Sequence, residues 1–499
     1  MKRVAEQRDL RLPLPVVVGN VDYRNFEARL VESDSLLRES GLEDDFVERR
    51  LREWERKGQG CATEAHANRG VSAKEQVRYQ RMCRQALRCN VARQLTEKEY
   101  RRFTRRLAES VLLQWFCGFD RIEAVRVPSK STLERYDKLA PENEVRELVN
   151  RLNRLAVSGQ VGLEAELDLE AYFSDATCVK AAIHFPVDWV LLRDGVRTLI
   201  KAIMVIRRHG LKHRMPEPEG FLKRVNQLAM AMAQSRRRAD SRKRRKRVLR
   251  QMKRLNRVVM EHAQRYRQEL AQNWEQQTDL KAGAVRQILK RIDGVLEQMP
   301  AAIRQAHERI IGERRVANAD KVLSLYEREL HVIVRGKAEA EVEFGNTLWL
   351  GEQSDGLIID WKLLRDQSPG DAKLFREGME RVHGVFGCYP RSAVGDRGVW
   401  SKDNERWLDR QGVYSALCPR GVRELEARMQ EPRFIALQKR RAQTEGRIGT
   451  IKNVFLGRPL RSKGFEHREV AAAWAILVHN LWLLAGLRME QDIAQKKAA

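Results

Sequence analysis

Three acidic residues occupy positions where a side chain that merely faces solvent is unusual. Asp175 interrupts the apolar, strand-like segment Leu167–Ile183, and Asp396 follows the short apolar segment Ser392–Val394. Glu445 lies inside a segment with helical periodicity. Two Asp at strand ends and one acid on a helix supply the oxygen ligands that Mg²⁺ prefers. Two such ions about 3.5–4 Å apart clamp the attacking and leaving oxygens of a phosphodiester. The pattern therefore predicts metal-assisted phosphoryl transfer.

Basic residues accompany these acids. Arg441 lies four residues before Glu445 and Lys452 seven residues after it, which places the three side chains on one helix face. Such cations would hold phosphate oxygens, and Arg397 directly follows Asp396. Residue type alone leaves the choice of acids open, because several others have comparable strand-end or loop positions: Asp188, Asp194, Asp355 and Asp360.

The elements that must position these residues alternate in type after the N-terminal region. Their order predicts an α/β fold, with a mixed sheet flanked by helices and a helical insertion after the first strand. The strand-like segments are Leu167–Ile183, Glu329–Val334, Glu341–Leu350, Gly356–Leu364, Ser392–Val394 and Val413–Leu417, and the helical ones are Asp371–Phe386, Asn404–Gln411, Arg433–Val454 and Glu469–Leu487.

The N-terminal region shows apolar stripes at helical spacing and predicts an all-helical block. Within it, the segment Ala108–Phe119, a turn and a helix capped by Ser129 allow a helix-turn-helix with Lys130 and Arg135 as DNA contacts. Most helix pairs with such a turn are only structural. The predicted helices are Tyr23–Ser40, Glu43–Lys57, Ser72–Asn90, Thr96–Cys117 and Glu142–Leu155.

The insertion carries most of the positive charge. Residues 201–320 hold 30 Lys+Arg and 12 Asp+Glu, and apolar residues from Val248 to Tyr266 and from Val285 to Ile310 alternate spacings of three and four. This spacing predicts a basic hairpin of two long, coiled-coil-like helices. A charge run is often only a solvated helix face, but its single sign favours phosphate binding. Its expected DNA contacts are Arg236, Arg237, Arg238, Arg242, Lys243, Arg244, Arg245, Lys246 and Arg247.

Composition agrees with a polyanionic partner. The 499 residues carry a formal charge of +27, and 42% of them are hydrophobic, so the chain can bury a sizeable core. The 7 Cys include no CxxC pair, which favours reduced thiols over a secreted disulfide scaffold. The most apolar stretch, Ala471–Leu487, contains His479 and Asn480 and predicts a buried core helix rather than a membrane span. We therefore expect a cytoplasmic, nucleoid-associated protein with no membrane partner.

From about Leu167 to its end, the chain resembles bacterial insertion-sequence transposases of the DDE class, and among them the ISNCY group. The glutamate helix of related families carries Tyr, Arg, Glu and Lys. Here Gln replaces the Tyr, which affects its expected contact near the end nucleotide rather than metal binding. The matching stretches are Tyr-Phe-Ser-Asp-Ala-Thr at 172–177, Val-Gly-Asp-Arg-Gly at 394–398, and Gln438, Arg441, Glu445 and Lys452.

The resemblance implies a ribonuclease-H-like catalytic domain and Mg²⁺-dependent DNA chemistry. Asp175 would bridge two Mg²⁺ ions, with Asp396 and Glu445 each holding one and Mn²⁺ a possible substitute. The enzyme would cut at the terminal inverted repeats and join the released 3′-OH to target DNA, as a homodimer and without ATP. We expect residues 1–160 to form a helical DNA-binding region, 161–200 and 321–499 the catalytic domain, and 201–320 its basic insertion.

Two segments also look like the family but have no assigned role, His209–Pro216 and Val334–Gly345. Three functional interpretations remain: an active transposase, a non-enzymatic nucleic-acid-binding protein whose acids are incidental, and a ribonuclease-H-like nuclease without strand transfer. The first two differ in whether Asp175, Asp396 and Glu445 come together in the fold.

Overall fold

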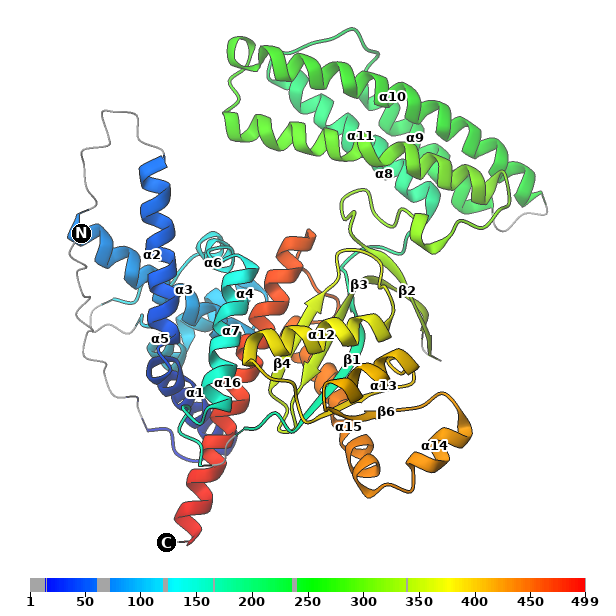
Figure 1. Cartoon of the computed structure of the whole chain (residues 1–499). Coiled ribbons are helices and arrows are strands. Elements are labelled where there is room, and N and C mark those ends of the chain that lie inside the picture. Colours follow the sequence, from blue (N-terminus) through cyan, green and yellow to red (C-terminus); the bar gives the residue numbers. More distant parts are fainter. Residues whose placement is uncertain are drawn as a thin grey trace. The chain divides into compact units, whose positions relative to one another are not determined.

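The chain forms two compact units, which are described separately (Figure 1). The computed structural model describes residues 14, 16–60, 72–119, 124–164, 167–235, 240–337 and 340–498. Unit 1 consists of Met1–Val179, Thr347–Leu364 and Ser368–Ala499, and unit 2 of Lys180–Asn346 and Arg365–Gln367. All three candidate acids belong to unit 1, whereas the basic insertion belongs to unit 2.

A mixed, six-stranded sheet has the order β2-β3-β1-β5-β6, with β4 paired to β3. The pairs β1–β5 and β5–β6 are parallel, whereas β3 is antiparallel to β2 and β4. The predicted mixed α/β sheet is confirmed, and its order is consistent with a ribonuclease-H-like transposase fold. The strands are β1 (Ala171–Lys180), β2 (His331–Lys337), β3 (Ala340–Glu352), β4 (Ile358–Leu363), β5 (Ser392–Gly395) and β6 (Tyr414–Leu417).

Helices from the C-terminal half pack on the sheet: α12 contacts β4, α13 contacts β6, and α15 contacts both β5 and β6 (Figure 1). The helix α15 begins with Pro432, whose fixed φ suits the first helical turn. It continues directly into a short π-helix, η3. These elements are α12 (Asp371–Phe386), α13 (Lys402–Arg410), α14 (Val422–Arg428), α15 (Pro432–Thr450), η3 (Ile451–Leu456) and α16 (Phe465–Ala498).

The N-terminal residues of unit 1 form helices that share one hydrophobic core with the sheet. One prediction is wrong in detail, because Thr96–Cys117 forms two helices that meet at Ser110. The extended backbone of Ser110 ends the first helix, and its side chain accepts a hydrogen bond from the Leu113 amide at 3.2 Å and caps the second. The helices are α1 (Val21–Glu39), α2 (Leu42–Gly60), α3 (Ala73–Thr96), α4 (Tyr100–Glu109), α5 (Val111–Cys117), α6 (Lys130–Asp137) and α7 (Glu142–Val157).

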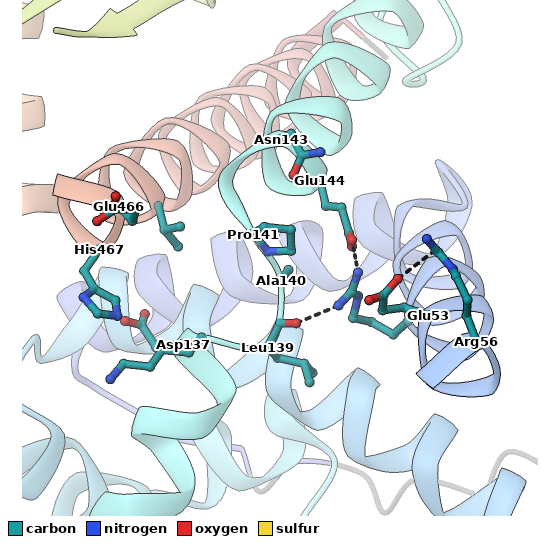
Figure 2. A pocket seen from close by; sticks show the side chains of 13 residues that line it. Glu53, Arg56, Asp137, Leu139, Ala140, Pro141, Asn143, Glu144, Glu466 and His467 are labelled. Atoms are coloured by element: carbon teal, nitrogen blue, oxygen red, sulfur yellow. Dashed lines mark hydrogen bonds and ion pairs between the residues drawn. The ribbon is translucent and has the colours of Figure 1, made fainter. Parts of the chain in front are cut away.

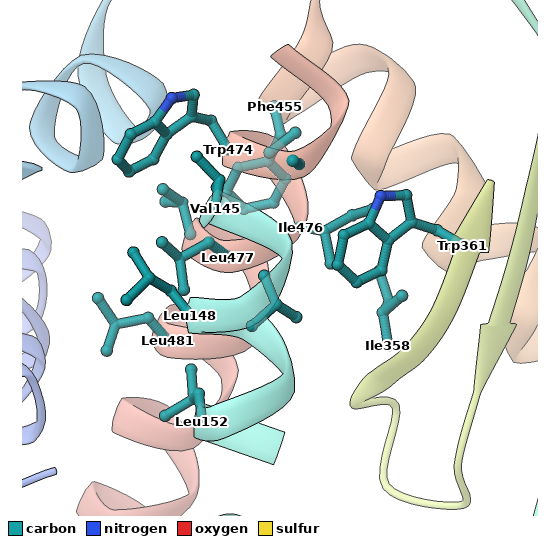
Figure 3. Close-up of a cluster of buried hydrophobic side chains, with 14 of the residues drawn as sticks. Val145, Leu148, Leu152, Ile358, Trp361, Phe455, Trp474, Ile476, Leu477 and Leu481 are labelled. Carbon is teal, nitrogen blue, oxygen red and sulfur yellow. The ribbon is translucent and has the colours of Figure 1, made fainter. Parts of the chain in front are cut away.

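The centre of unit 1 is α16, which lies against α7 and α1. Figure 3 shows Leu148 and Leu152 of α7 beside Leu477 and Leu481 of α16, and Trp361 of β4 beside Ile476 of α16. By length and composition Phe465–Lys497 is apolar enough to cross a membrane, but 78% of its most apolar window is buried inside the protein. It is therefore the expected core helix.

The buried amide of Asn480 has several hydrogen-bond partners inside this core. Asn480 of α16 accepts a hydrogen bond from the Ile358 amide (3.1 Å) and donates to the Ile358 carbonyl (2.8 Å) and to Asn153 of α7 (2.9 Å). Burial lowers the pKa of the neighbouring His479 to about 4, so that ring is neutral at pH 7. The buried amide of Asn480 thus ties two helices to the edge strand β4.

Unit 2 contains a bundle of four helices, where the sequence predicted a hairpin of two. Its core combines residues of α8 and α9 with the stripe from Val248 to Tyr266 and residues of α11. The apolar stripe of the predicted hairpin is therefore covered by helices of the same chain. The helices are α8 (Asp188–Arg208), α9 (Pro218–Gln234), α10 (Ser241–Gln277) and α11 (Ala282–Ile310).

Replacing Asn480 with Leu should lower the free energy of unfolding by about 2–4 kcal/mol, because the amide of Ile358 and the side chain of Asn153 lose buried partners. Urea unfolding followed by circular dichroism measures the change. Asn143→Leu, on the exposed side of α7, is the control and should change the value little. Equal effects of the two substitutions would contradict a structural role for this amide.

Candidate functional site

The register of two parallel strands brings the two aspartates together. Phe173 of β1 pairs with Val394 of β5, and Asp175 and Asp396 each follow two residues later. Because β1 and β5 run in the same direction, Asp396, just beyond the end of β5, lies level with Asp175, which is inside β1 and not at its end as predicted. Both side chains are half-buried.

The turn after β5 fixes Asp396. Its Oδ1 atom accepts hydrogen bonds from the amides of Gly398 (2.8 Å) and Val399 (3.1 Å). A Cβ atom at position 398 would lie 3.0 Å from this oxygen and equally close to Oδ2 of Asp371. The second glycine of the Gly-Asp-Arg-Gly turn therefore leaves space for the carboxylate to bend back onto the backbone.

The third acid is contributed by α15. Glu445 pairs with Arg441 at 3.4 Å, and its side chain is 61% exposed. Lys452 of η3 donates to Thr177 of β1 at 3.0 Å. The predicted face of Arg441, Glu445 and Lys452 therefore lies alongside the strand that carries Asp175.

Electrostatic coupling places the three acids in one neighbourhood. The pKa of Asp175 is raised to about 6, mainly by burial and also by the negative charges of Asp396 and Glu445. The hydrogen bond from the Ala176 amide (2.7 Å) and the charge of Arg441 act in the opposite direction. Asp175 therefore takes up a proton more readily than an exposed aspartate.

The donor set suits a hard divalent cation, since all three groups are carboxylates acting on one another. Among the described residues, however, no three His, Cys, Asp or Glu side chains are close enough to hold a metal ion as they stand. Asp396 bonds its own turn and Glu445 pairs with Arg441. The three carboxylates fit a hard cation in chemical type, but their side chains as they lie do not form a metal site.

A buried carboxylate that the sequence analysis missed holds α15 in place. Glu352, at the end of β3, is only 2% exposed. It accepts hydrogen bonds from Arg440 (2.9 Å), Thr444 (2.7 Å) and Arg447 (2.8 Å). The spacing of these three partners marks one face of α15, but only the fold reveals that Glu352 faces it.

The residue that replaces the family's Tyr also anchors α15. The side chain of Gln438 donates to the carbonyls of Gly395 (3.2 Å) and Ala416 (2.6 Å), at the ends of β5 and β6. An amide donor at this position therefore ties the helix to the strand that precedes Asp396.

The competing acids have structural partners. Asp188 pairs with Arg309 at 2.9 Å, and Asp194 pairs with Arg193 at 2.8 Å. The carboxylate of Asp355 accepts a hydrogen bond from Gln353 at 2.9 Å. Asp360 is buried and bonded to Arg381 (2.6 Å), Tyr172 (2.9 Å) and Trp349 (3.1 Å). These bonds explain the four acids without chemistry, which leaves Asp175, Asp396 and Glu445 as the candidate set.

The predicted helix-turn-helix does not have the expected turn. Ser129 caps α6 as predicted, accepting from the Thr132 amide at 3.3 Å. Residues 118–129 separate α5 from α6, whereas such motifs use a turn of about 3–4 residues. Lys130 pairs with Glu134 at 2.8 Å, and Arg135 donates to Thr132 at 3.2 Å.

The predicted contacts on the insertion belong to unit 2. Arg236, Arg237 and Arg238 lie outside the described residues, and the others occupy the first turns of α10. Arg242 (3.6 Å) and Lys246 (2.9 Å) share Glu313. Lys243 and Arg247 are exposed, and Arg244 and Arg245 are half-buried.

The two unassigned family-like segments have structural contacts. His209 bonds Asp279, the His213 amide donates to the Tyr266 hydroxyl at 3.1 Å, and Glu343 pairs with Lys180 at 2.9 Å.

In unit 1, a pocket of about 580 Å³ lies among α2, α7 and α16 (Figure 2). Its lining includes none of the candidate acids Asp175, Asp396 and Glu445. Its charges are largely internally paired, as between Arg56 and Glu53 at 2.7 Å.

Comparison with known proteins decides the class. Residues 352–481 match the family model described as a transposase DDE domain. The chain therefore contains a transposase DDE domain, which supports an insertion-sequence transposase of the DDE class. The match includes Asp396 and Glu445 but begins after Asp175. Comparisons with curated proteins and with solved structures give no match. The narrower ISNCY resemblance of this transposase stays a prediction.

Glu352→Gln should destabilise the transposase by about 1–3 kcal/mol, because Arg440 and Arg447 lose a charged partner but are partly exposed. Urea unfolding measures the loss. Glu445→Gln, on the same helix but with an exposed ion pair, is the matched control and should cost less than about 0.5 kcal/mol. If the two variants unfold at the same urea concentration, the hydrogen bonds between Glu352 and α15 have no special role in stability.

Asp175→Asn should raise the thermal midpoint of the metal-free transposase at pH 8. A carboxylate with a raised pKa opposes folding when it is charged. The pKa moves from 3.8 to about 6 on folding. The gain is therefore complete above about pH 6 and shrinks as the pH falls towards 4. Thermal scans in EDTA at pH 8 and pH 5 measure it. An equal gain at both pH values, or a loss at pH 8, would show that the charge of Asp175 is not the cause.

Proposed function

We propose that this transposase binds the terminal inverted repeats of its own element, cleaves the element ends, and joins the 3′-OH to target DNA. The observation that carries this proposal is the coupling of Asp175 to Asp396 and Glu445 within a chain that has a transposase DDE domain. Acids from two parallel strands and a helix act on one another there.

The three acids share the catalytic role. Asp175, Asp396 and Glu445 would hold Mg²⁺, two ions per site with Mn²⁺ as substitute, which supplies charge neutralisation and activation of the attacking oxygen. With its pKa raised to about 6, Asp175 is mostly charged above pH 7, and the charged form is the one that binds a cation. Glu445 is exposed enough to turn from Arg441 towards the aspartates.

The cations beside the acids position the DNA backbone. Arg441 is released when Glu445 turns, and its guanidinium is then available for a phosphate oxygen. Lys452 lies against β1 beside the same acids, and Arg397 is exposed at the turn that carries Asp396. Positioning and charge neutralisation are the main sources of rate in phosphoryl transfer.

Further DNA contacts come from the basic helices. The first turns of α10, from Arg242 to Arg247, present cations to phosphates, and Lys130 and Arg135 of α6 are the N-terminal candidates. Both element ends must be processed in one complex, so we expect a homodimer. Because the apolar seam is buried, the dimer must use another surface.

A nuclease without strand transfer is the second candidate, since it needs the same acids and the same metals. A purely DNA-binding role is less well supported, because it leaves the coupled acids and the DDE domain without a purpose. The enzymatic candidates separate in one assay: a linear element end, a target plasmid and Mg²⁺. Joined product supports the transposase, and cleavage without joining supports the nuclease.

Asp396→Asn should abolish cleavage of an element end while the dissociation constant for DNA changes less than about twofold, because a neutral amide is a poor cation ligand. Gel-based cleavage and fluorescence anisotropy measure the two properties. Asp409→Asn removes an exposed carboxylate on α13 and is the control that should cleave normally. Binding that is lost together with cleavage would count against a metal-holding role for Asp396.

A further inference from the structure

A pocket lined by arginines lies in unit 2 where α10 begins and α11 ends. Its volume is about 300 Å³. Five arginines line it against a single acid, Glu313: Arg242, Arg245, Arg309, Arg314 and Arg315. The side chain of Arg242 is 85% exposed, so the pocket is open to solvent on that side. Its charge requires an anion from outside or a partner within the chain.

Internal partners neutralise only part of this charge. Arg309 pairs with Asp188 at 2.9 Å and Arg314 with Glu308 at 2.6 Å. Within the described part of the chain, neither Arg245 nor Arg315 has a hydrogen bond or ion pair to an acid. Arg245 is nonetheless half-buried, so its guanidinium gives up part of its hydration without a compensating anion.

The start of α10 adds to the positive potential. The helix has 37 residues, no acid in its first turn and no side-chain cap. Cations at a helix N-terminus are electrostatically unfavourable, because the free amides there already carry partial positive charge. Asp240 at the N-cap offsets part of this effect, and a further anion near Arg242 and Arg245 would offset more of it.

Glu313 is the one anion already in the pocket. Its carboxylate pairs with Lys246 at 2.9 Å and, more weakly, with Arg242 at 3.6 Å. A phosphate brings more oxygens than a carboxylate and can accept paired hydrogen bonds from guanidinium groups. It would compete with Glu313 for Arg242 and engage Arg245 and Arg315.

We infer that this arginine pocket is a binding site for one backbone phosphate of duplex DNA. The inference rests on the proposed function for the choice of DNA, since the pocket chemistry alone specifies a phosphate. It goes further by placing one anchored contact among the many cations of the insertion. Removing that contact must cost more than removing equal charge elsewhere on α10.

The test compares two double variants of the full-length transposase, Arg245→Gln/Arg315→Gln and Arg250→Gln/Arg254→Gln. Each removes two positive charges, and the second pair is exposed on the same helix but outside the pocket. Anisotropy with a random-sequence duplex, over a range of salt concentrations, should show about tenfold weaker binding for the pocket variant. Its slope of log Kd against log salt should fall by about 1, the loss of one phosphate contact. The control variant should change affinity less than about threefold. If the two double variants weaken DNA binding equally, the attraction is diffuse, and the inference of a specific phosphate site is overturned.

A second pair of variants tests the competition. Glu313→Gln should tighten duplex binding about threefold, because a competing carboxylate is removed, whereas Glu261→Gln on the exposed side of α10 should leave it nearly unchanged. No gain from Glu313→Gln would contradict the competition. Thermal melts of all four variants verify the fold. The proposal would also be overturned if the pocket variant bound an RNA duplex or inorganic phosphate more weakly than the wild type but bound duplex DNA with unchanged affinity.

Failure of this site and failure of the proposed function are distinguishable. The pocket variant is read by its affinity for duplex DNA and its salt slope, whereas the proposed function is read by cleavage with the acids of unit 1. Asp396→Asn should keep the full salt slope while cleavage is lost. A wild-type slope in the pocket variant would overturn the pocket alone, and absence of cleavage by the wild-type enzyme would overturn the proposed function alone.

Discussion

The arrangement of the candidate site depends on one buried carboxylate. Glu352 receives Arg440, Thr444 and Arg447 from α15, and each of these bonds fixes the rotation of the helix about its own axis. Glu445 directly follows Thr444, so fixing the buried row also fixes the direction of Glu445. The exposed pair of Glu445 with Arg441 is too weak to do this. A helix that must present an acid to two aspartates is thus oriented by a different acid on its protected side.

The charges of the candidate site lower the stability of the folded protein. Burial and the charges of Asp396 and Glu445 raise the pKa of Asp175, which means that the charged form destabilises the folded protein. The packing around β1 offsets this cost, because Phe173 and Tyr172 beside it are buried in the cores of unit 1. Gln438 adds a tie between α15 and the ends of β5 and β6. A cation between the acids would remove the repulsion, so the same residues favour folding and binding only when both occur together.

Local patterns in the sequence predicted most elements of the fold and the three candidate acids. The strands are short apolar runs between turns. Three features were beyond reach because they depend on contacts between distant segments. These are the partner of Glu352, the packing of α8 and α9 with the basic hairpin, and the bonds that make Asp360 structural. The break at Ser110 was visible as a capping residue and was overlooked.

In the basic insertion, burial decides whether an apolar stripe serves association between chains or packing within one chain. The stripe from Val248 to Tyr266 has the spacing of an association seam, yet α8, α9 and α11 of the same chain cover it. The property of α10 that remains available to a partner is its positive charge. Cations at the start of α10 oppose the helix dipole, and Asp240 at the N-cap and Glu313 offset part of this effect. Some arginines of unit 2 pair with acids of the chain, as Arg309 does with Asp188, whereas Arg245 and Arg315 have no acidic partner among the described residues.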